Sequence, residues 1–131
     1  MGVSFLLDTH VLLWLLSTPD RVPSRVRADL ADRDNQLLVS AATGLEIATK
    51  VRIGKLTAPD LPLTLAARVE RIGATELPIT IAHAVLAGSL TWTHRDPFDR
   101  LLVAQATTED ATLVTVDEAM TALATPPVLT W

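Results

Sequence analysis

Cysteine is absent from the 131-residue chain. This absence excludes both a disulfide framework and a zinc site with cysteine ligands. A chain without cysteine suits the reducing cytoplasm, and we expect the protein to be cytoplasmic.

Long apolar runs are also absent, because the longest uninterrupted one extends only from Val11 to Leu16. A membrane-spanning helix needs roughly 20 apolar residues, so no membrane span is predicted. No basic residue precedes Arg21, and the start of the chain therefore lacks the pattern of a signal peptide.

Positive charge is scarce and unevenly placed. The formal net charge is −4, and residues 101–131 contain neither lysine nor arginine. The negative net charge disfavours indiscriminate binding to nucleic acid. Lys50, Arg52 and Lys55 form the tightest basic group, which is compatible with a local basic rim beside an acidic site.

The residues that are present favour one folded domain spanning 1–131, since 49% are hydrophobic and 20% are charged. Strands are predicted at 3–7, 36–40, 74–79, 111–116 and 128–129. Helices are predicted at 10–17, 24–33, 41–52, 63–72, 81–87 and 97–108, with a short one after Asp117. Pro59 and Pro62 mark a loop. This alternation predicts an α/β/α three-layer sandwich with a mainly parallel central sheet of four or five strands.

One carboxylate lies inside the apolar stretch "FLLDTHVLLWLL" (5–16). It is Asp8, which directly follows the first predicted strand, and Asp117 follows the fourth. If the strands are parallel, both residues lie at the carboxyl edge of the sheet, where ligands bind in such folds. Taken singly, either aspartate could simply cap a helix.

Two further acids lie on predicted helices, and a third directly precedes one. Glu46 is four residues before Lys50, so an ordinary ion pair on a solvated face is one interpretation, although its neighbours are largely apolar. Asp96 precedes Pro97 and can cap a helix. Asp99 shares a helix face with apolar residues and is expected to point toward the core.

Taken together, Asp8, Glu46, Asp99 and Asp117 come from separate elements and could converge on one site. Clustered carboxylates repel one another, and a divalent cation relieves that repulsion. Oxygen ligands without cysteine or paired histidine favour Mg²⁺ or Mn²⁺. The histidines show no metal-ligand spacing and are interpreted as structural or surface residues: His10, His83 and His94.

With these acids in place, the chain resembles the PIN domain over essentially its full length, and more narrowly the VapC-type ribonuclease toxins. The first and second acids lie in "LLDTHVLLWLL" and "VSAATGLEIATKVRIGKL", and "LPITIAHAVLAGSL" resembles the central segment. The third and fourth acids lie in "HRDPFDRLLVAQA" and "TLVTVDEAM". Leu45 departs from the tryptophan common in relatives. The residues flanking Asp117 also depart from the usual pattern.

The resemblance implies a catalytic set of Asp8, Glu46, Asp99 and Asp117, of which Asp8, Asp99 and Asp117 would bind the metal. Secondary candidates at the site are Asp96, Thr115 and Thr9. Possible RNA contacts are Lys50, Arg52, Arg95 and Arg100. For these basic residues, solvated helix ends and surface ion pairs are the alternative interpretations.

The resemblance further implies a Mg²⁺- or Mn²⁺-dependent endoribonuclease acting on structured RNA such as tRNA or rRNA. A cognate antitoxin and a homodimer are the implied protein partners. A catalytically degenerate PIN-like binding module is the alternative, but it would lack one or more of the acids. Receiver-type phosphotransfer and haloacid-dehalogenase-type sites are disfavoured, because no lysine follows Lys55 and position 10 is His10.

Overall fold

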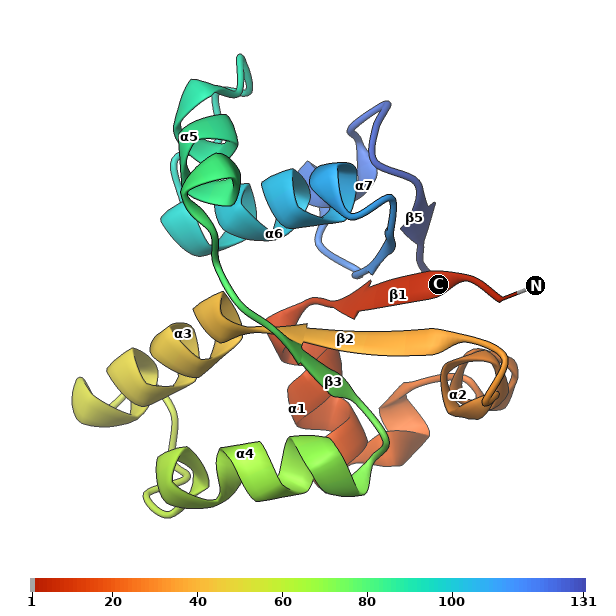
Figure 1. Cartoon of the computed structure of the whole chain (residues 1–131). Coiled ribbons are helices and arrows are strands. Elements are labelled where there is room, and N and C mark those ends of the chain that lie inside the picture. Colours follow the sequence, from red (N-terminus) through yellow and green to blue (C-terminus); the bar gives the residue numbers. More distant parts are fainter. Residues whose placement is uncertain (1) are drawn as a thin grey trace.

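The computed structural model describes residues 2–131 and is built around a five-stranded sheet (Figure 1). The strand order is β3-β2-β1-β4-β5, and all four neighbouring pairs are parallel. This confirms the predicted fold class. The strands are β1 (Ser4–Leu7), β2 (Gln36–Ser40), β3 (Thr75–Leu77), β4 (Thr112–Val114) and β5 (Val128–Leu129).

Seven α-helices and one 3₁₀ turn connect the strands within residues 2–131: α1 (Thr9–Ser17), the 3₁₀ turn η1 (Pro19–Arg21), α2 (Ser24–Ala31), α3 (Ala41–Arg52), α4 (Leu61–Arg71), α5 (Ile81–Ser89), α6 (Pro97–Thr108) and α7 (Glu118–Thr121). Helix α4 begins two residues earlier than predicted. Pro62 lies in its first turn, where proline costs the helix no hydrogen bond. No helix in this part of the chain is both long and apolar enough to cross a bilayer.

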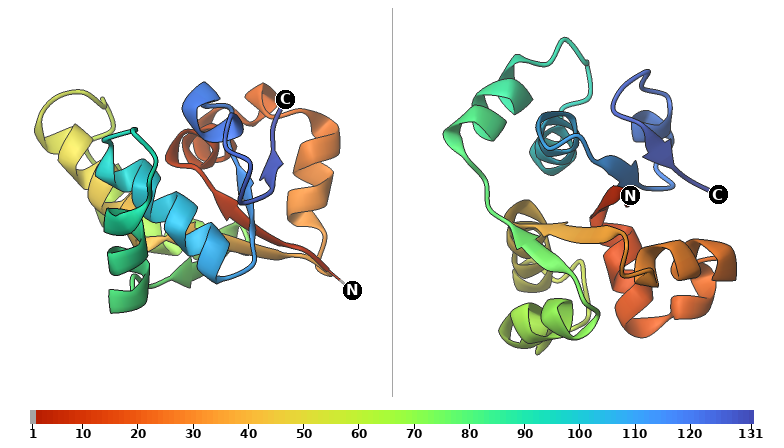
Figure 2. Two further views of the ribbon diagram at one scale, coloured as in Figure 1. Left: turned by 90° about the horizontal axis from the view of Figure 1, so that it is seen from above. Right: turned by 45° about the vertical axis from the view of Figure 1, so that its right-hand side comes forward.

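Alternating side chains of the strands build a separate core on each face of the sheet. Phe5 and Leu7 of β1 face one core, whereas Leu6 between them faces the other. Helices α1 to α4 cover the first face, and α6 and α7 cover the second (Figure 2). Helix α5 packs against α6. Because both faces are covered, β1 and β2 read as nearly continuous apolar runs.

The topology reverses direction beside β1. From β1 the chain proceeds outward through β2 to β3, and it then returns to place β4 on the opposite side of β1. Ligands in open α/β sheets bind at such a switch point, outside the carboxyl ends of the strands. The first residue after β1 is Asp8, and the first after β4 is Thr115.

Candidate active site

Asp8 is buried at the switch point, with 7% of its surface exposed. It occupies the N-cap position of α1, yet its side chain makes no capping bond. Instead the Thr115 hydroxyl donates to Oδ2 of Asp8 at 2.8 Å. Burial raises the pKa of Asp8, hydrogen bonds from Thr115 and the Thr9 backbone oppose this, and the negative charges of Glu46 and Asp117 raise the pKa further. Helix capping therefore does not account for this side chain.

Glu46 is equally buried and lies on α3, opposite the start of α1. The Thr9 hydroxyl donates to Oε1 at 2.8 Å, and the Lys50 ammonium donates to Oε2 at 2.6 Å. The ion pair with Lys50 is thus present, but it does not lie on a fully solvated face. The hydrogen bond to Glu46 is the main reason that the pKa of Lys50 is raised.

The two aspartates at the start of α6 have different positions. Asp96 caps the helix, because its Oδ1 accepts from the backbone amides of Phe98 at 2.9 Å and Asp99 at 3.2 Å. Asp99 points inward, with 14% of its side chain exposed, and its Oδ2 lies 2.7 Å from Nε2 of His94. The placement of Asp99 toward the interior was correctly predicted.

The pKa of Asp99 is raised to about 6. Burial is the largest cause, and the hydrogen bond from His94 opposes it. The negative charges of Asp96, Asp8 and Asp117 raise the pKa further. These interactions show that Asp8 and Asp99 lie close enough to repel each other, although 91 positions separate them in sequence.

Asp117 is exposed and caps α7 through a 2.8 Å bond from the Ala119 amide to Oδ1. The capping interpretation is therefore correct for its side chain. Its own backbone amide donates to the Thr115 hydroxyl at 3.0 Å, which links it to the residue that contacts Asp8. The charge of Asp117 raises the pKa of both Asp8 and Asp99, so it also borders the site.

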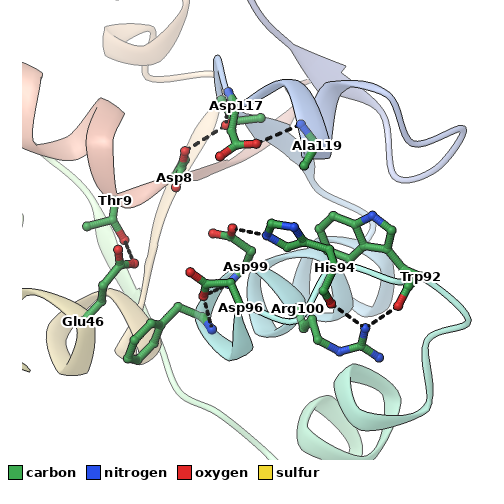
Figure 3. Close-up of polar contacts among 12 residues, drawn as sticks. Asp8, Thr9, Glu46, Trp92, His94, Asp96, Asp99, Arg100, Asp117 and Ala119 are labelled. Carbon is green, nitrogen blue, oxygen red and sulfur yellow. Dashed lines mark hydrogen bonds and ion pairs between the residues drawn. The ribbon is translucent and has the colours of Figure 1, made fainter.

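Figure 3 shows Asp8, Glu46, Asp99 and Asp117 around one region, and we call these four residues the carboxylate cluster. No group of three acidic or histidine side chains within residues 2–131 is already arranged to hold a metal ion. The cluster nevertheless fits a divalent cation in its chemistry. All its donors are carboxylate oxygens, which Mg²⁺ and Mn²⁺ prefer, and the ionised forms of Asp8 and Asp99 are disfavoured by like charges that a cation would neutralise.

The basic residues near the cluster fall into two groups. Arg100 is engaged internally, because its guanidinium donates to four backbone carbonyls, which leaves one of its five N–H groups for other partners. That bonding argues against the RNA contact predicted for Arg100. Lys50 is partly exposed beside Glu46, whereas Arg52 and Arg95 are exposed to solvent.

His94 is interpreted from the sequence as a structural or surface residue, and its contact with Asp99 is not predicted. The structure places its ring between Trp92 and Asp99, with ring centroids of Trp92 and His94 4.5 Å apart. The available signal was the spacing of a histidine five residues before an inward-facing aspartate. That spacing does not match a metal-binding pair. His94 also lies in a loop before α6, and no local pattern predicts the course of that loop.

The family model that describes the PIN domain matches residues 5–126. The chain belongs to the PIN domain family. PIN domains are generally nucleases, and the match includes all four residues of the carboxylate cluster. Comparison with curated protein sequences gives no significant match.

Solved structures resemble this PIN domain across nearly its whole length. VapBC2 from Rickettsia felis, bound to a DNA fragment from its promoter, has a TM-score of 0.73 and 17% identity, covering 98% of this chain and 99% of that one. DNA-bound VapBC from Salmonella typhimurium has a TM-score of 0.72 and 17% identity, covering 98% of each chain. VapBC-5 from Mycobacterium tuberculosis has a TM-score of 0.60 and 18% identity, again covering 98% of each. At these identities the likeness establishes the fold.

Proposed function

We propose that this PIN domain is a Mg²⁺- or Mn²⁺-dependent endoribonuclease that acts as the toxin of a type II toxin–antitoxin pair. The observation that carries the proposal is the convergence of Asp8 and Asp99. Both side chains are largely buried and both have a raised pKa. The charge of Asp8 raises the pKa of Asp99, and the charges of Glu46 and Asp117 raise that of Asp8. Carboxylates with perturbed pKa values at the ligand-binding edge of a sheet are typical of a functional site.

The metal ligands in this proposal are Asp8, Asp99 and Asp117. A bound Mg²⁺ or Mn²⁺ supplies a Lewis acid that makes water nucleophilic at neutral pH. Thr115 orients Asp8 through its hydroxyl bond, and Glu46 either completes the ligand set or orients the attacking water. Thr9 holds one oxygen of Glu46, and Asp96 fixes the first turn of α6, on which Asp99 lies.

The reaction is hydrolysis of a phosphodiester in structured RNA, such as tRNA or rRNA. A bond forms between the water oxygen and phosphorus, and the bond from phosphorus to the 3′ oxygen breaks. The products are a 5′-phosphate and a 3′-hydroxyl, with one proton of the water ending on the 3′ oxygen. Lys50, Arg52 and Arg95 are the proposed contacts to RNA phosphates.

The structural neighbours support the proposed antitoxin partner, because they are complexes named VapBC and FitAB. By analogy, a cognate antitoxin covers the carboxylate cluster, and the protein works in the cytoplasm. A homodimer belongs to the same proposal. Ile81 and Val85 on α5 support it, because 85% and 62% of their surfaces are exposed and apolar residues this exposed often mark an interface.

The direct test is cleavage of purified tRNA and rRNA by the wild type, Asp8→Asn and Asp99→Asn, with Mg²⁺ or Mn²⁺ and with EDTA. We expect cleavage that requires metal and that falls about 100-fold or more in both variants, because each loses a charged ligand. Asp20→Asn is the matched control, since Asp20 is exposed and follows the opposite end of α1 from Asp8. Full activity in both cluster variants would contradict the assignment. Metal-independent RNA binding without cleavage would favour the degenerate binding module.

A further inference from the structure

Residues 90–96, which connect α5 to α6, have no regular secondary structure but are tightly held by Arg100. Its Nη1 donates to the carbonyls of Trp92 at 2.7 Å and His94 at 2.9 Å, and its Nη2 donates to Leu90 at 2.8 Å. Its Nε donates to Ala87 at the end of α5 at 2.9 Å. Hydrogen bonds from a charged donor are stronger than neutral ones, so the backbone on each side of His94 has a fixed course.

The His94 ring is fixed in turn by two side chains. It stacks on Trp92 with ring centroids 4.5 Å apart and an angle of 24° between the ring planes. Its Nε2 lies 2.7 Å from Oδ2 of Asp99. An ionised carboxylate only accepts hydrogen bonds, so Nε2 carries the hydrogen and donates. Backbone, stacking and hydrogen bond together leave this ring one orientation.

This contact determines how Asp99 faces the rest of the carboxylate cluster. Oδ2 is directed at His94, while the second oxygen points away from the ring, toward the space between Asp8 and Glu46 (Figure 3). A carboxylate held through one oxygen loses rotational freedom before any ligand arrives. Partners of this kind orient metal ligands in proteins, and their loss weakens metal affinity.

We propose that His94 is a positioning residue for the carboxylate cluster, holding Asp99 so that its second oxygen is presented to a divalent cation. The inference rests on the proposed function, because it needs Asp99 to be a metal ligand. The proposal adds a residue that contacts neither cation nor RNA. It also assigns a purpose to the stacking of Trp92 on His94 and to the hydrogen bonds by which Arg100 holds the loop.

His10 offers a matched comparison within the same chain. It also packs on a tryptophan, with its ring centroid 5.5 Å from that of Trp14, but it is exposed to solvent. Replacing His10 therefore removes a histidine–tryptophan contact without removing a donor to Asp99. His83 is less suitable, since it completes the cap of α5 and lies 3.4 Å from Glu109.

The experiment measures the affinity of the intact protein for Mn²⁺ alone by calorimetric titration. Three variants are compared with the wild type: His94→Phe keeps a ring to stack on Trp92 but has no donor, His94→Gln places an amide donor near the position of Nε2, and His10→Phe is the control. We expect His94→Phe to weaken Mn²⁺ binding about 10-fold or more. We expect His94→Gln to recover most of that loss and His10→Phe to bind as the wild type does.

Two results would overturn the positioning role while leaving the proposed function intact. One is wild-type affinity in His94→Phe. The other is an equal loss in His94→Phe and His94→Gln, which would assign the effect to packing and not to the donor. A wild type that binds no Mn²⁺ identifies a failure of the proposed function itself, and the positioning role falls with it. Circular dichroism and thermal unfolding of each variant separate loss of affinity from loss of fold.

Discussion

The two sides of the carboxylate cluster differ in how their negative charge is compensated. On the α3 side, Glu46 accepts hydrogen bonds from a hydroxyl and from the Lys50 ammonium, 2.6 Å away. On the β1–α6 side, Asp8 and Asp99 accept side-chain bonds from Thr115 and His94, and their neighbours are acids. Uncompensated charge is therefore concentrated between β1 and α6. A cation bound between β1 and α6 would therefore relieve more repulsion than one bound beside Glu46.

The largest expected effect on stability comes from removing charge on the uncompensated side. Asp99→Asn should stabilise the metal-free protein at pH 7 by on the order of 2 kcal/mol, because the pKa of Asp99 is about 6 in the folded protein and near 4 in an unfolded chain. The folded protein binds the carboxyl proton of Asp99 more tightly than the unfolded chain does. The stability that this protonation contributes is therefore fully present below pH 4 and is lost as the pH rises through 6.

Urea unfolding in EDTA at pH 4 and pH 7 measures this effect as the difference between Asp99→Asn and the wild type. The difference should be near zero at pH 4 and should favour the variant at pH 7. Saturating Mn²⁺ should reverse the order at pH 7, since only the wild type gains the full stabilisation from binding. A difference that stays constant with pH would show that the charge on Asp99 is already compensated.

A smaller difference in the free energy of unfolding is expected between variants of the two threonines that donate to the cluster. Thr115→Val removes the side-chain donor to Asp8 and should lower the free energy of unfolding at pH 7 by about 2 kcal/mol. Thr9→Val should cost about 1 kcal/mol, because Glu46 keeps its bond to Lys50. Both threonines are buried, so the substitutions are matched in environment. The measurement is urea unfolding of both variants. Equal losses of unfolding free energy, or a larger loss in Thr9→Val, would contradict the difference between the two sides of the cluster.

The smallest effect is expected at Lys50 itself. Lys50→Met should lower stability by about 0.5 kcal/mol, because 40% of the lysine side chain is exposed and partly solvated ion pairs contribute little. The loss should shrink further in 1 M NaCl, where exposed charges are screened. Lys55→Met, at an exposed position outside the pair, is the control. A loss several times larger, measured by the same unfolding experiment, would mean that Glu46 depends on Lys50 alone.

Much of the fold follows from local patterns. Apolar strands separated by amphipathic helices predict the parallel sheet, and the cap residues locate several helix starts within a residue or two. Ser40, for example, caps α3 as predicted, and its hydroxyl accepts from the Ala42 amide. Asp8 was identifiable as a candidate site residue because an acid in an apolar run needs a reason to be buried, and the structure does bury it. Helix α4 shows the limit, since proline serves equally in a loop and in a first helical turn.

The contact between His94 and Asp99 depends on interactions that leave no local signature in the sequence. His94 reaches Asp99 because Arg100 bonds to backbone carbonyls, which every residue possesses. The identities of the residues in the loop therefore carry little information about the path of its backbone. For the same reason Arg100 was predicted to meet RNA, although its donors are directed inward. Charge pattern indicates which groups are available but does not show which partner each one takes.

The return of the chain to the side of β1 has a consequence for the order in which the nuclease is completed. Asp8 leaves the ribosome early, but the hydroxyl that it contacts belongs to a residue 107 positions later. A nascent chain that stops short of β4 exposes one edge of β1 and leaves that acid without its threonine. The carboxylate cluster is therefore assembled only after the chain has been translated through β4 and Asp117.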